Sequence, residues 1–288
     1  MNQKLKMKNR FFILIITLLC GLLSFSQDIT IVGGTVKCPA PLAVGYSRTI
    51  TGKTYYVVDS AAITSILDTG SFSVGASTIT PADLSCVCTT QITSMEDMFN
   101  GRATFNDDIS NWDTSSVTTM DAMFYKASSF NQPLNSWTVS SVIDMDAMFR
   151  EASSFNQPLN SWTVSNVTTM SNMFRQASAF NQPLNNWGVG NVRYMQFLFR
   201  QSGFNQPLNN WDVSKVTNMN EMFMNSPFDQ PIDNWTVSNV TSMAKLFRGT
   251  DFNQPLNSWT VSQVTNFGQM FMDNDKFNQP LDNWNVSS

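Results

Sequence analysis

The residue types that most often carry out chemistry are scarce in this chain. It has 288 residues and no histidine, which removes Ser-His and Cys-His catalytic pairs and most zinc sites. The acidic pairs Asp107/Asp108 and Asp144/Asp146 do not recur and stand beside no nucleophile. Carboxylates in loops are usually exposed to water without a catalytic role. A glycosidase pair also needs a deep cleft, and a chain made of short tandem repeats, as described below, offers few. We therefore expect no enzymatic activity, no catalytic residues and no cofactor.

The cysteines suit a disulfide better than a metal site. Cys38, Cys86 and Cys88 all precede the repeated part of the chain. In an oxidising compartment, one bridge should join Cys38 to one member of the Cys-Val-Cys pair, and we favour Cys88 and leave Cys86 unpaired. A metal site is the alternative, but three thiols without a histidine support it poorly.

Eight tryptophans recur at steps of 24 or 25 residues, and they define the organisation of the chain. A period of this length indicates one supersecondary unit copied side by side, each copy burying its apolar face against its neighbours. The copies lie at 92–116, 117–141, 142–166, 167–191, 192–215, 216–239, 240–263 and 264–288. The tryptophans could stack on sugars, but their place in the apolar pattern points inward.

Within a copy, the apolar spacing predicts a strand followed by a short helix. From Leu134 the order is L-x-x-W-x-V, which occupies the places of the L-x-x-L-x-L of a leucine-rich repeat. From Val142 the apolar residues are three and four apart, as on one helical face. The M-x-x-M spacing of this segment resembles soft copper ligands, but Leu198 and Leu246 replace methionine in other copies, so core packing is favoured. The predicted fold is an α/β, right-handed, leucine-rich-repeat-like solenoid of eight 24–25-residue strand-helix repeats with a small β-rich N-terminal cap.

An asparagine stands at one fixed position of the F-N-Q-P-L element. We expect these amides to form a stacked row that satisfies backbone groups of the adjacent copy. A weakly bound cation is the alternative. The row consists of Asn131, Asn156, Asn181, Asn205, Asn253 and Asn278, with Asp229 in one copy.

The N-terminus indicates secretion. Four basic residues precede the apolar run FFILIITLLCGLL and the small-residue segment SFSQ, the three parts of a signal peptide, which we assign to residues 1–26. The run is too short for a stable transmembrane span, and lipidation at Cys20 is the competing interpretation. Removing the signal leaves a formal charge of −8. An acidic protein without a basic stripe is not expected to bind nucleic acid.

Residues 27–91 are expected to form an N-terminal cap region, and 92–288 the repeat solenoid. DITIVGGTVKC and RTITGKTYYVVD alternate apolar and polar residues and suggest two or three strands. SAAITSILDTG predicts a short helix ended by Gly70. The chain stops at Ser288 directly after a predicted strand, which suggests a fragment or a truncated gene.

The recurring V-T-x-M-x-x-M-F, F-N-Q-P-L-N-x-W and V-S-N-V-T elements resemble the BspA-like leucine-rich-repeat surface proteins of bacteria. The resemblance covers all eight copies. It implies a secreted or surface-attached protein that binds other proteins or extracellular matrix, often in adhesion, without identifying the ligand.

The candidate binding face is the polar position between each tryptophan and the following valine. Short polar side chains there would form a ladder that presents variable residues to a protein or glycan, or merely a solvated surface. An interaction or adhesion module is the favoured function; a carbohydrate-binding module and a structural spacer or fragment without its own ligand are the alternatives. The residues chosen are Asp113, Thr138, Thr163, Asp212, Thr236 and Thr260.

Overall fold

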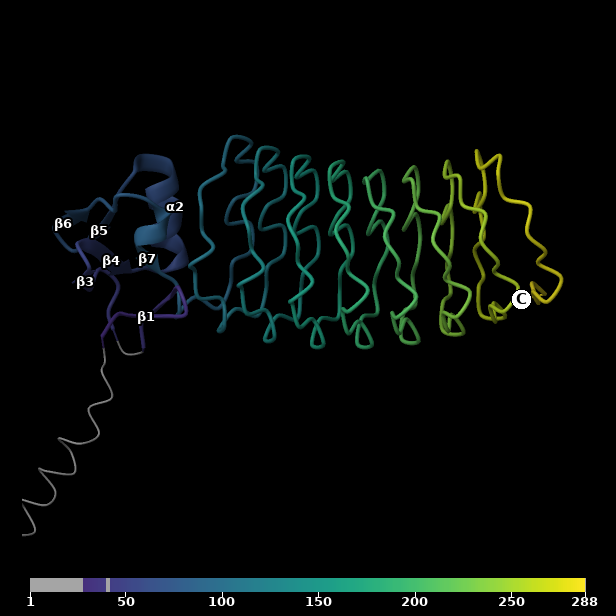
Figure 1. Ribbon diagram of the computed structural model, residues 1–288, viewed down its shortest axis with the longest axis horizontal. Helices are drawn as coiled ribbons and strands as arrows, with labels where there is room; N and C mark the ends of the chain where they lie inside the picture. Colours follow the sequence, from purple (N-terminus) through teal and green to yellow (C-terminus); the bar gives the residue numbers. More distant parts are fainter. Residues whose placement is uncertain (1–27, 40–41, 288) are drawn as a thin grey trace, which may run out of the picture.

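The protein is a rod of stacked coils with a small folded unit at its N-terminal end (Figure 1). The computed structural model describes residues 28–39 and 42–287. The predicted signal peptide, residues 1–26, lies outside the described residues. No helix in residues 28–39 and 42–287 is long and apolar enough to cross a membrane.

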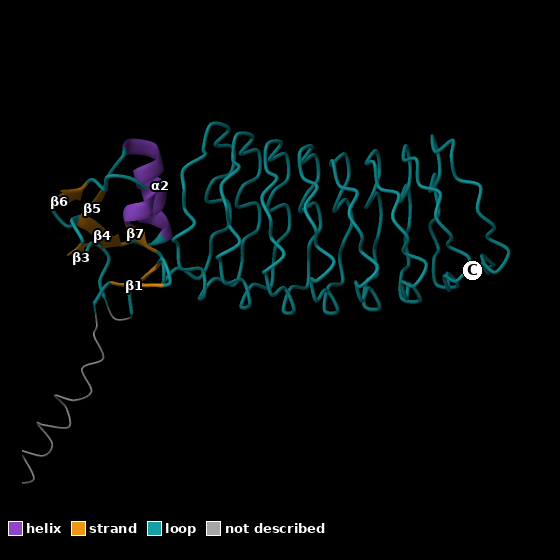
Figure 2. Ribbon diagram, in the orientation of Figure 1, coloured by secondary structure: helices purple, strands orange, loops and turns teal. Residues whose placement is uncertain are grey.

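The N-terminal unit is built from short strands around one helix (Figure 2). β1 (Thr30–Val32) pairs antiparallel with β2 (Thr35–Lys37), and β5 (Phe72–Val74) with β6 (Ser77–Ile79). The three-stranded sheet has the order β3-β4-β7, in which β3 (Ser47–Ile50) is antiparallel to β4 (Lys53–Val57) and β7 (Val87–Cys88) is parallel to it. A 3-10 turn, η1 (Leu84–Cys86), leads into β7.

The helix of this unit, α2 (Ser60–Thr69), has both ends capped by local chemistry. The side chain of Asp59 accepts a hydrogen bond from the Ala62 amide at 2.7 Å. Gly70 adopts a left-handed conformation (φ 77°) and its amide bonds the Ile66 carbonyl. The helix predicted in this region is therefore confirmed, including its glycine end.

A disulfide joins Cys38 to Cys88, the pair preferred from the sequence, with 6.0 Å between their Cα atoms. It ties the end of β2 to β7. Cys86 is a buried free thiol.

The solenoid differs from the predicted strand-helix repeat, because no helix occurs in residues 92–287 of the described chain (Figure 2). Consecutive coils are joined instead by isolated parallel bridges at one position, Ser94, Thr119, Asp144, Thr169, Tyr194, Asn218, Ser242 and Asn266. These bridges lie in the segment expected to be helical. The predicted strand, L-x-x-W-x-V, contains a turn in which the Trp137 amide bonds the Leu134 carbonyl at 3.0 Å.

The expected helix is replaced by successive tight turns that also bond the next coil. In the second coil the Met123 amide bonds the Met120 carbonyl within a turn, at 3.2 Å. The Met120 amide bonds the Asp144 carbonyl of the following coil at 3.0 Å. Two positions per turn segment have positive φ, as at Ala122 (51°) and Lys126 (60°), which an α-helix does not allow. Apolar residues three apart are therefore the first and fourth residues of β-turns, a spacing that turns share with helices.

The core is a set of aromatic columns running along the rod. Trp235 stacks on Trp211 and on Trp259, each at 6.5 Å between ring centroids, and is 3% exposed. Its indole Nε1 donates to the Leu208 carbonyl of the preceding coil at 3.0 Å. Equivalent bonds hold every tryptophan from Trp112 to Trp284. The prediction that the indoles face inward is confirmed.

Phenylalanine and methionine fill the rest of this core. Phe149 stacks on Phe155 of its own coil at 4.0 Å and on Phe174 of the next at 5.7 Å. Met145 and Met148 are fully buried, as core packing requires. In the last described coil the matching rings, such as Trp284, are only half-buried because no further coil packs on them in the described chain.

The asparagine row is present and lies where the sequence indicated. The Asn131 side-chain oxygen accepts from the Asn156 amide at 3.0 Å, and Asn156 repeats this bond to Asn181. Asp229 takes the same role toward the Asn253 amide at 2.9 Å. The row satisfies backbone donors between coils, which gives it a structural explanation.

Candidate functional site

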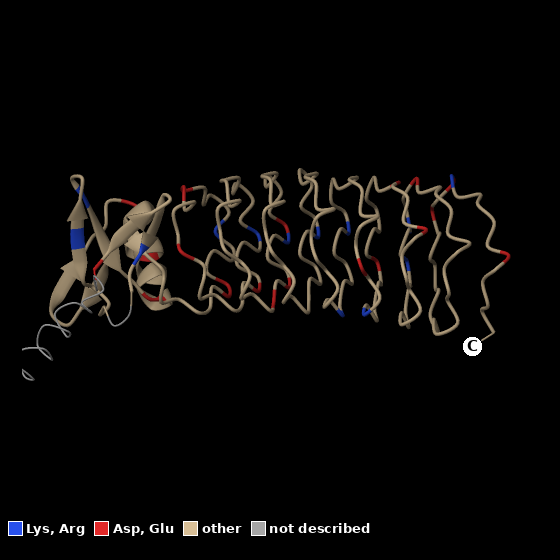
Figure 3. Cartoon of the chain, turned by 60° about the horizontal axis from the view of Figure 1, so that its bottom comes forward, with Lys and Arg blue, Asp and Glu red and all other residues tan. Residues whose placement is uncertain are grey.

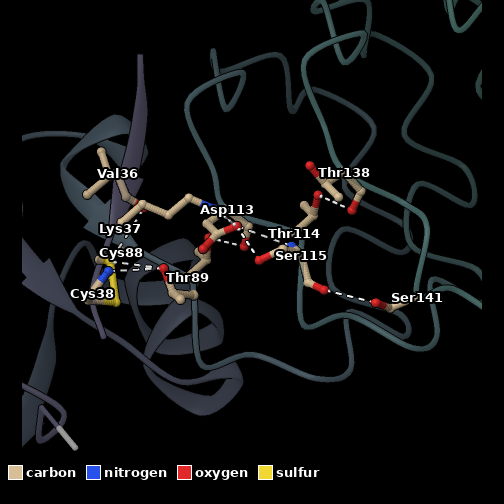
Figure 4. Close-up of polar contacts among 11 residues, drawn as sticks. Val36, Lys37, Cys38, Cys88, Thr89, Asp113, Thr114, Ser115, Thr138 and Ser141 are labelled. Atoms are coloured by element: carbon tan, nitrogen blue, oxygen red, sulfur yellow. Dashed lines mark hydrogen bonds and ion pairs between the residues drawn. A yellow bond between two sulfur atoms is a disulfide. The ribbon is translucent and has the colours of Figure 1, made fainter. Parts of the chain in front are cut away.

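One predicted binding residue, Asp113, is not on the surface. Its side chain is 1% exposed and lies 2.6 Å from the Lys37 ammonium of β2 (Figure 4). Burial raises the pKa of Asp113, but hydrogen bonds from Lys37, Thr90 and Ser115 outweigh it and hold the pKa below its usual value. The assignment of Asp113 to a binding face is wrong, because the N-terminal unit covers this edge of the first coil.

The same edge anchors the N-terminal unit to the solenoid through the backbone. The Val36 amide bonds the Asn111 carbonyl at 3.0 Å, and the Thr89 hydroxyl bonds the Asp113 carbonyl at 3.0 Å. The Trp112 indole donates to the Leu84 carbonyl at 2.9 Å. The N-terminal unit therefore accepts a hydrogen bond from the tryptophan of the first coil, just as each coil accepts one from the tryptophan of the next coil.

The other five predicted residues lie in the open along one edge of the rod, which we name the threonine edge: Thr138, Thr163, Asp212, Thr236 and Thr260. Each stands between two tight turns, such as Leu134–Trp137 and Val139–Val142, so its side chain cannot enter the core. The four threonine hydroxyls make no hydrogen bond within the described residues. The Asp212 carboxylate accepts from the Ser214 amide at 3.0 Å, and bonds from Ser214 lower the pKa of Asp212.

The threonine edge is hollowed at two places. One shallow depression is lined by Trp187, Gly188, Asn210 and Asp212, where glycine leaves a gap in the row. A second lies beside Thr260, between Trp259 and Asn285. Both are open depressions, so the edge suits an extended ligand better than a small molecule.

A second row, missed in the sequence analysis, lies on the bridging segment of the coils. We name it the arginine row: Arg150, Arg175 and Arg200, at the same position of three consecutive coils. Backbone bonds join these positions, since the Glu151 amide bonds the Arg175 carbonyl at 2.8 Å and the Gln176 amide bonds the Arg200 carbonyl at 2.8 Å. The recurrence of arginine after M-F or L-F was the signal available in the sequence. Charged positions are otherwise sparse along the coils (Figure 3).

A group of carboxylates lies on the same segment in the first coils. The pKa of Asp121 is raised to about 6, chiefly by burial and then by the neighbouring charges of Asp144, Asp146, Glu96 and Asp97. No group of three or more His, Cys, Asp or Glu side chains within the described residues could hold a metal ion.

The family described as "Mycoplasma protein of unknown function, DUF285" matches residues 70–187, 136–228, 158–249 and 201–288. The chain belongs to this family. The overlapping matches follow the tandem repetition seen in the coils. Together they run from Gly70, directly after α2, through β5, β6 and β7 to the end of the solenoid. No curated protein and no solved structure matches the chain.

Proposed function

We propose that this DUF285 protein is a secreted or cell-surface interaction module that binds a protein, extracellular-matrix or glycan ligand along an extended face of its solenoid. The observation that carries the proposal is the threonine edge, where exposed hydroxyls without partners occur in two pairs of consecutive coils, Thr138/Thr163 and Thr236/Thr260, on a fully packed core. A rigid row of unpaired polar groups offers binding without an ordering cost in the protein. Secretion is supported by the basic, apolar and small-residue pattern of residues 1–26.

We further propose kinship with the BspA-like leucine-rich-repeat surface proteins and a right-handed winding of the coils. The support is the recurrence of V-T-x-M-x-x-M-F and F-N-Q-P-L-N-x-W in fixed order through the repeats. Because the coils here are made of turns and single bridges, the kinship would concern the repeat pattern and not a shared helix.

A carbohydrate-binding module is the second candidate. The depression at Gly188 and Asp212 supports it, since the Asp212 carboxylate and the Ser165 hydroxyl both line it and can bond the hydroxyls of a sugar. A structural spacer is the remaining alternative, in which the threonine edge is only solvated.

The test places bulk and charge on the threonine edge of the secreted chain. Thr138→Arg with Thr163→Arg should abolish binding to a glycan array or to a matrix-protein panel if the ligand lies there. The matched control is Ser154→Arg with Ala179→Arg, because both positions are exposed and lie on the opposite part of the repeat, after the bridging segment. Equal binding by both double variants would refute the threonine edge as the binding face, and absence of any ligand for the native chain would favour the spacer.

A further inference from the structure

The repeat changes at one place on the threonine edge. Glycines stand at 188 and 190 in the fourth coil, where the third coil has Thr163 and Ser165. In the fifth coil, Asp212 stands at the threonine position. Gly188, Gly190 and Asp212 all line one depression with a volume of about 300 Å³, which we name the glycine notch. Because the other coils fold without these three residues, their clustering indicates a local role beyond folding.

The glycines open the notch by omitting side chains, since the backbone there is ordinary. Neither glycine has a positive φ. A β-carbon at Gly188 would meet no atom within 4 Å, whereas one at Gly190 would lie 3.1 Å from the Asp212 Oδ2. The two glycines therefore keep open the space beside the carboxylate, and residues with side chains could adopt the same backbone.

The walls of the notch carry hydrogen-bonding groups of both kinds. The Ser165 hydroxyl and the Asn210 side-chain amide line it and make no hydrogen bond within the described residues. Asp212 accepts from the Ser214 amide at 3.0 Å through Oδ1, while its Oδ2 lies beside Gly190. The notch thus offers a carboxylate acceptor together with a hydroxyl and an amide that can both donate and accept.

The charge of the notch disfavours an acidic occupant. Asp212 is the one charged residue among those that line it. Lys215 is close enough to lower the pKa of Asp212, after the larger effect of bonds from Ser214, but it does not line the notch. Its ammonium donates instead to the Asn191 side-chain oxygen at 2.7 Å. An anion would therefore be repelled by Asp212, and a neutral occupant is favoured.

The notch also lacks the apolar anchor that a protein ligand would need. Its large apolar residues, Trp187 and Val189, are buried and present almost no surface. Protein–protein contacts depend on aromatic and aliphatic anchors at their centre. A sugar ring does not need such an anchor, because each of its hydroxyls can donate to a carboxylate and accept from an amide or a hydroxyl.

We propose that the glycine notch holds one neutral hexose ring of a glycan that lies along the threonine edge. The inference rests on the proposed function, in which this edge binds an extended ligand, and it names neutral glycans as the ligand class. Ring hydroxyls would donate to the Asp212 carboxylate in charge-assisted bonds. The notch volume is at the lower end of the range of about 300–1,000 Å³ for ligand sites, which suits a single ring. Thr163 and Thr236 stand on either side along the edge and can meet the adjacent rings.

The experiment starts with the secreted chain on an array of neutral, sialylated and sulfated oligosaccharides. The neutral oligosaccharide with the strongest signal is then titrated by isothermal titration calorimetry. The main test variant is Gly188→Thr with Gly190→Ser, because it gives the fourth coil the residues of the third and should fold. Asp212→Asn is the second variant. Its matched control is Asp233→Asn, since Asp233 is exposed in the following coil and does not line the notch.

We expect neutral oligosaccharides to bind, and their sialylated and sulfated forms to bind at least about tenfold more weakly. The double glycine variant should lose at least about tenfold in affinity, because its side chains fill the notch and displace the carboxylate. Its melting temperature should be kept or raised, since replacing glycine at a compatible φ reduces the freedom of the unfolded chain. Asp212→Asn should lose about tenfold and Asp233→Asn less than about twofold.

Four results would overturn the inference. They are no binding of any neutral oligosaccharide by the native chain, equally tight binding of acidic forms, native affinity in the double glycine variant, and equal losses in Asp212→Asn and Asp233→Asn.

Failure of the notch can be told apart from failure of the proposed function. If the native chain binds a matrix protein but no neutral oligosaccharide, and Thr138→Arg with Thr163→Arg abolishes that binding, the threonine edge stands and the notch proposal is refuted. If the native chain binds neither a glycan nor a matrix protein, both proposals are refuted.

Discussion

Replacing Trp235 by alanine should destabilise the solenoid far more than the same change at Trp284. Both residues occupy the same repeat position, but Trp235 is 3% exposed and stacks on a tryptophan on each side, while Trp284 is half-buried and stacks on Trp259 alone among the tryptophans. The two substitutions therefore remove the same side chain from a buried and from a half-buried position.

The magnitude follows from what the alanine removes. Truncating a buried tryptophan costs about 3–5 kcal/mol through lost transfer energy and the cavity that remains. The Leu208 carbonyl also loses its indole donor but keeps the bond from the Trp211 amide at 3.0 Å, so the lost hydrogen bond adds only about 1 kcal/mol. Trp284→Ala, with one side already in water, should cost about half as much.

Thermal unfolding by circular dichroism measures the difference. For a chain of this size about 1 kcal/mol shifts the melting temperature by 2–4 °C, so Trp235→Ala should lower it by about 10 °C or more. Trp235→Phe keeps the apolar ring and loses the indole donor, and should cost about 1–3 kcal/mol. Equal shifts for Trp235→Ala and Trp284→Ala would refute the argument that stacking between coils stabilises the rod.

Further predictions concern the junction, the turns and the carboxylates. Asp113→Ala should destabilise the contact of the N-terminal unit with the first coil by about 2 kcal/mol, since a buried carboxylate and its bond to Lys37 are lost; faster hydrogen exchange confined to β2 and the first coil would show it. Ala147→Gly should raise stability by about 0.5–1 kcal/mol in urea unfolding, because Ala147 has φ 51°, and a loss of stability would contradict the turn geometry. Asp121→Asn should stabilise the protein near pH 7, and the gain should vanish below about pH 4. The pKa of Asp121 is raised in the folded state, so the folded chain binds more protons than the unfolded one between about pH 4 and 6, and native stability falls as pH rises through that window. A gain that is independent of pH would show that charge is not the cause.

Much of the architecture could be predicted from the residues alone. The tryptophan period indicated the number of repeats, and the position of each indole in the apolar pattern placed it in the core. The asparagine row was also predicted from the period, because a polar residue at one fixed position of every coil lies beside the equivalent residue of the neighbouring coil. Local signals also located α2, since Gly70 and the run before it form a helix end.

The secondary structure inside the coil could not be predicted in this way. Apolar residues three apart fit a helical face and also fit the first and fourth residues of a β-turn. The choice depends on whether an amide such as that of Met120 bonds its own segment or the Asp144 carbonyl of the next coil. That partner is 24 residues away and exists only once the coils have stacked.

The sequence by itself determined the repeat, its period and which side chains are apolar enough to be buried, because these depend on residue type and spacing. Only the tertiary structure decided that Asp113 is buried by β2 and that the Met120 segment forms turns bonded to the next coil. The physical reason is that burial and hydrogen-bond partners depend on neighbours brought together from distant parts of the chain.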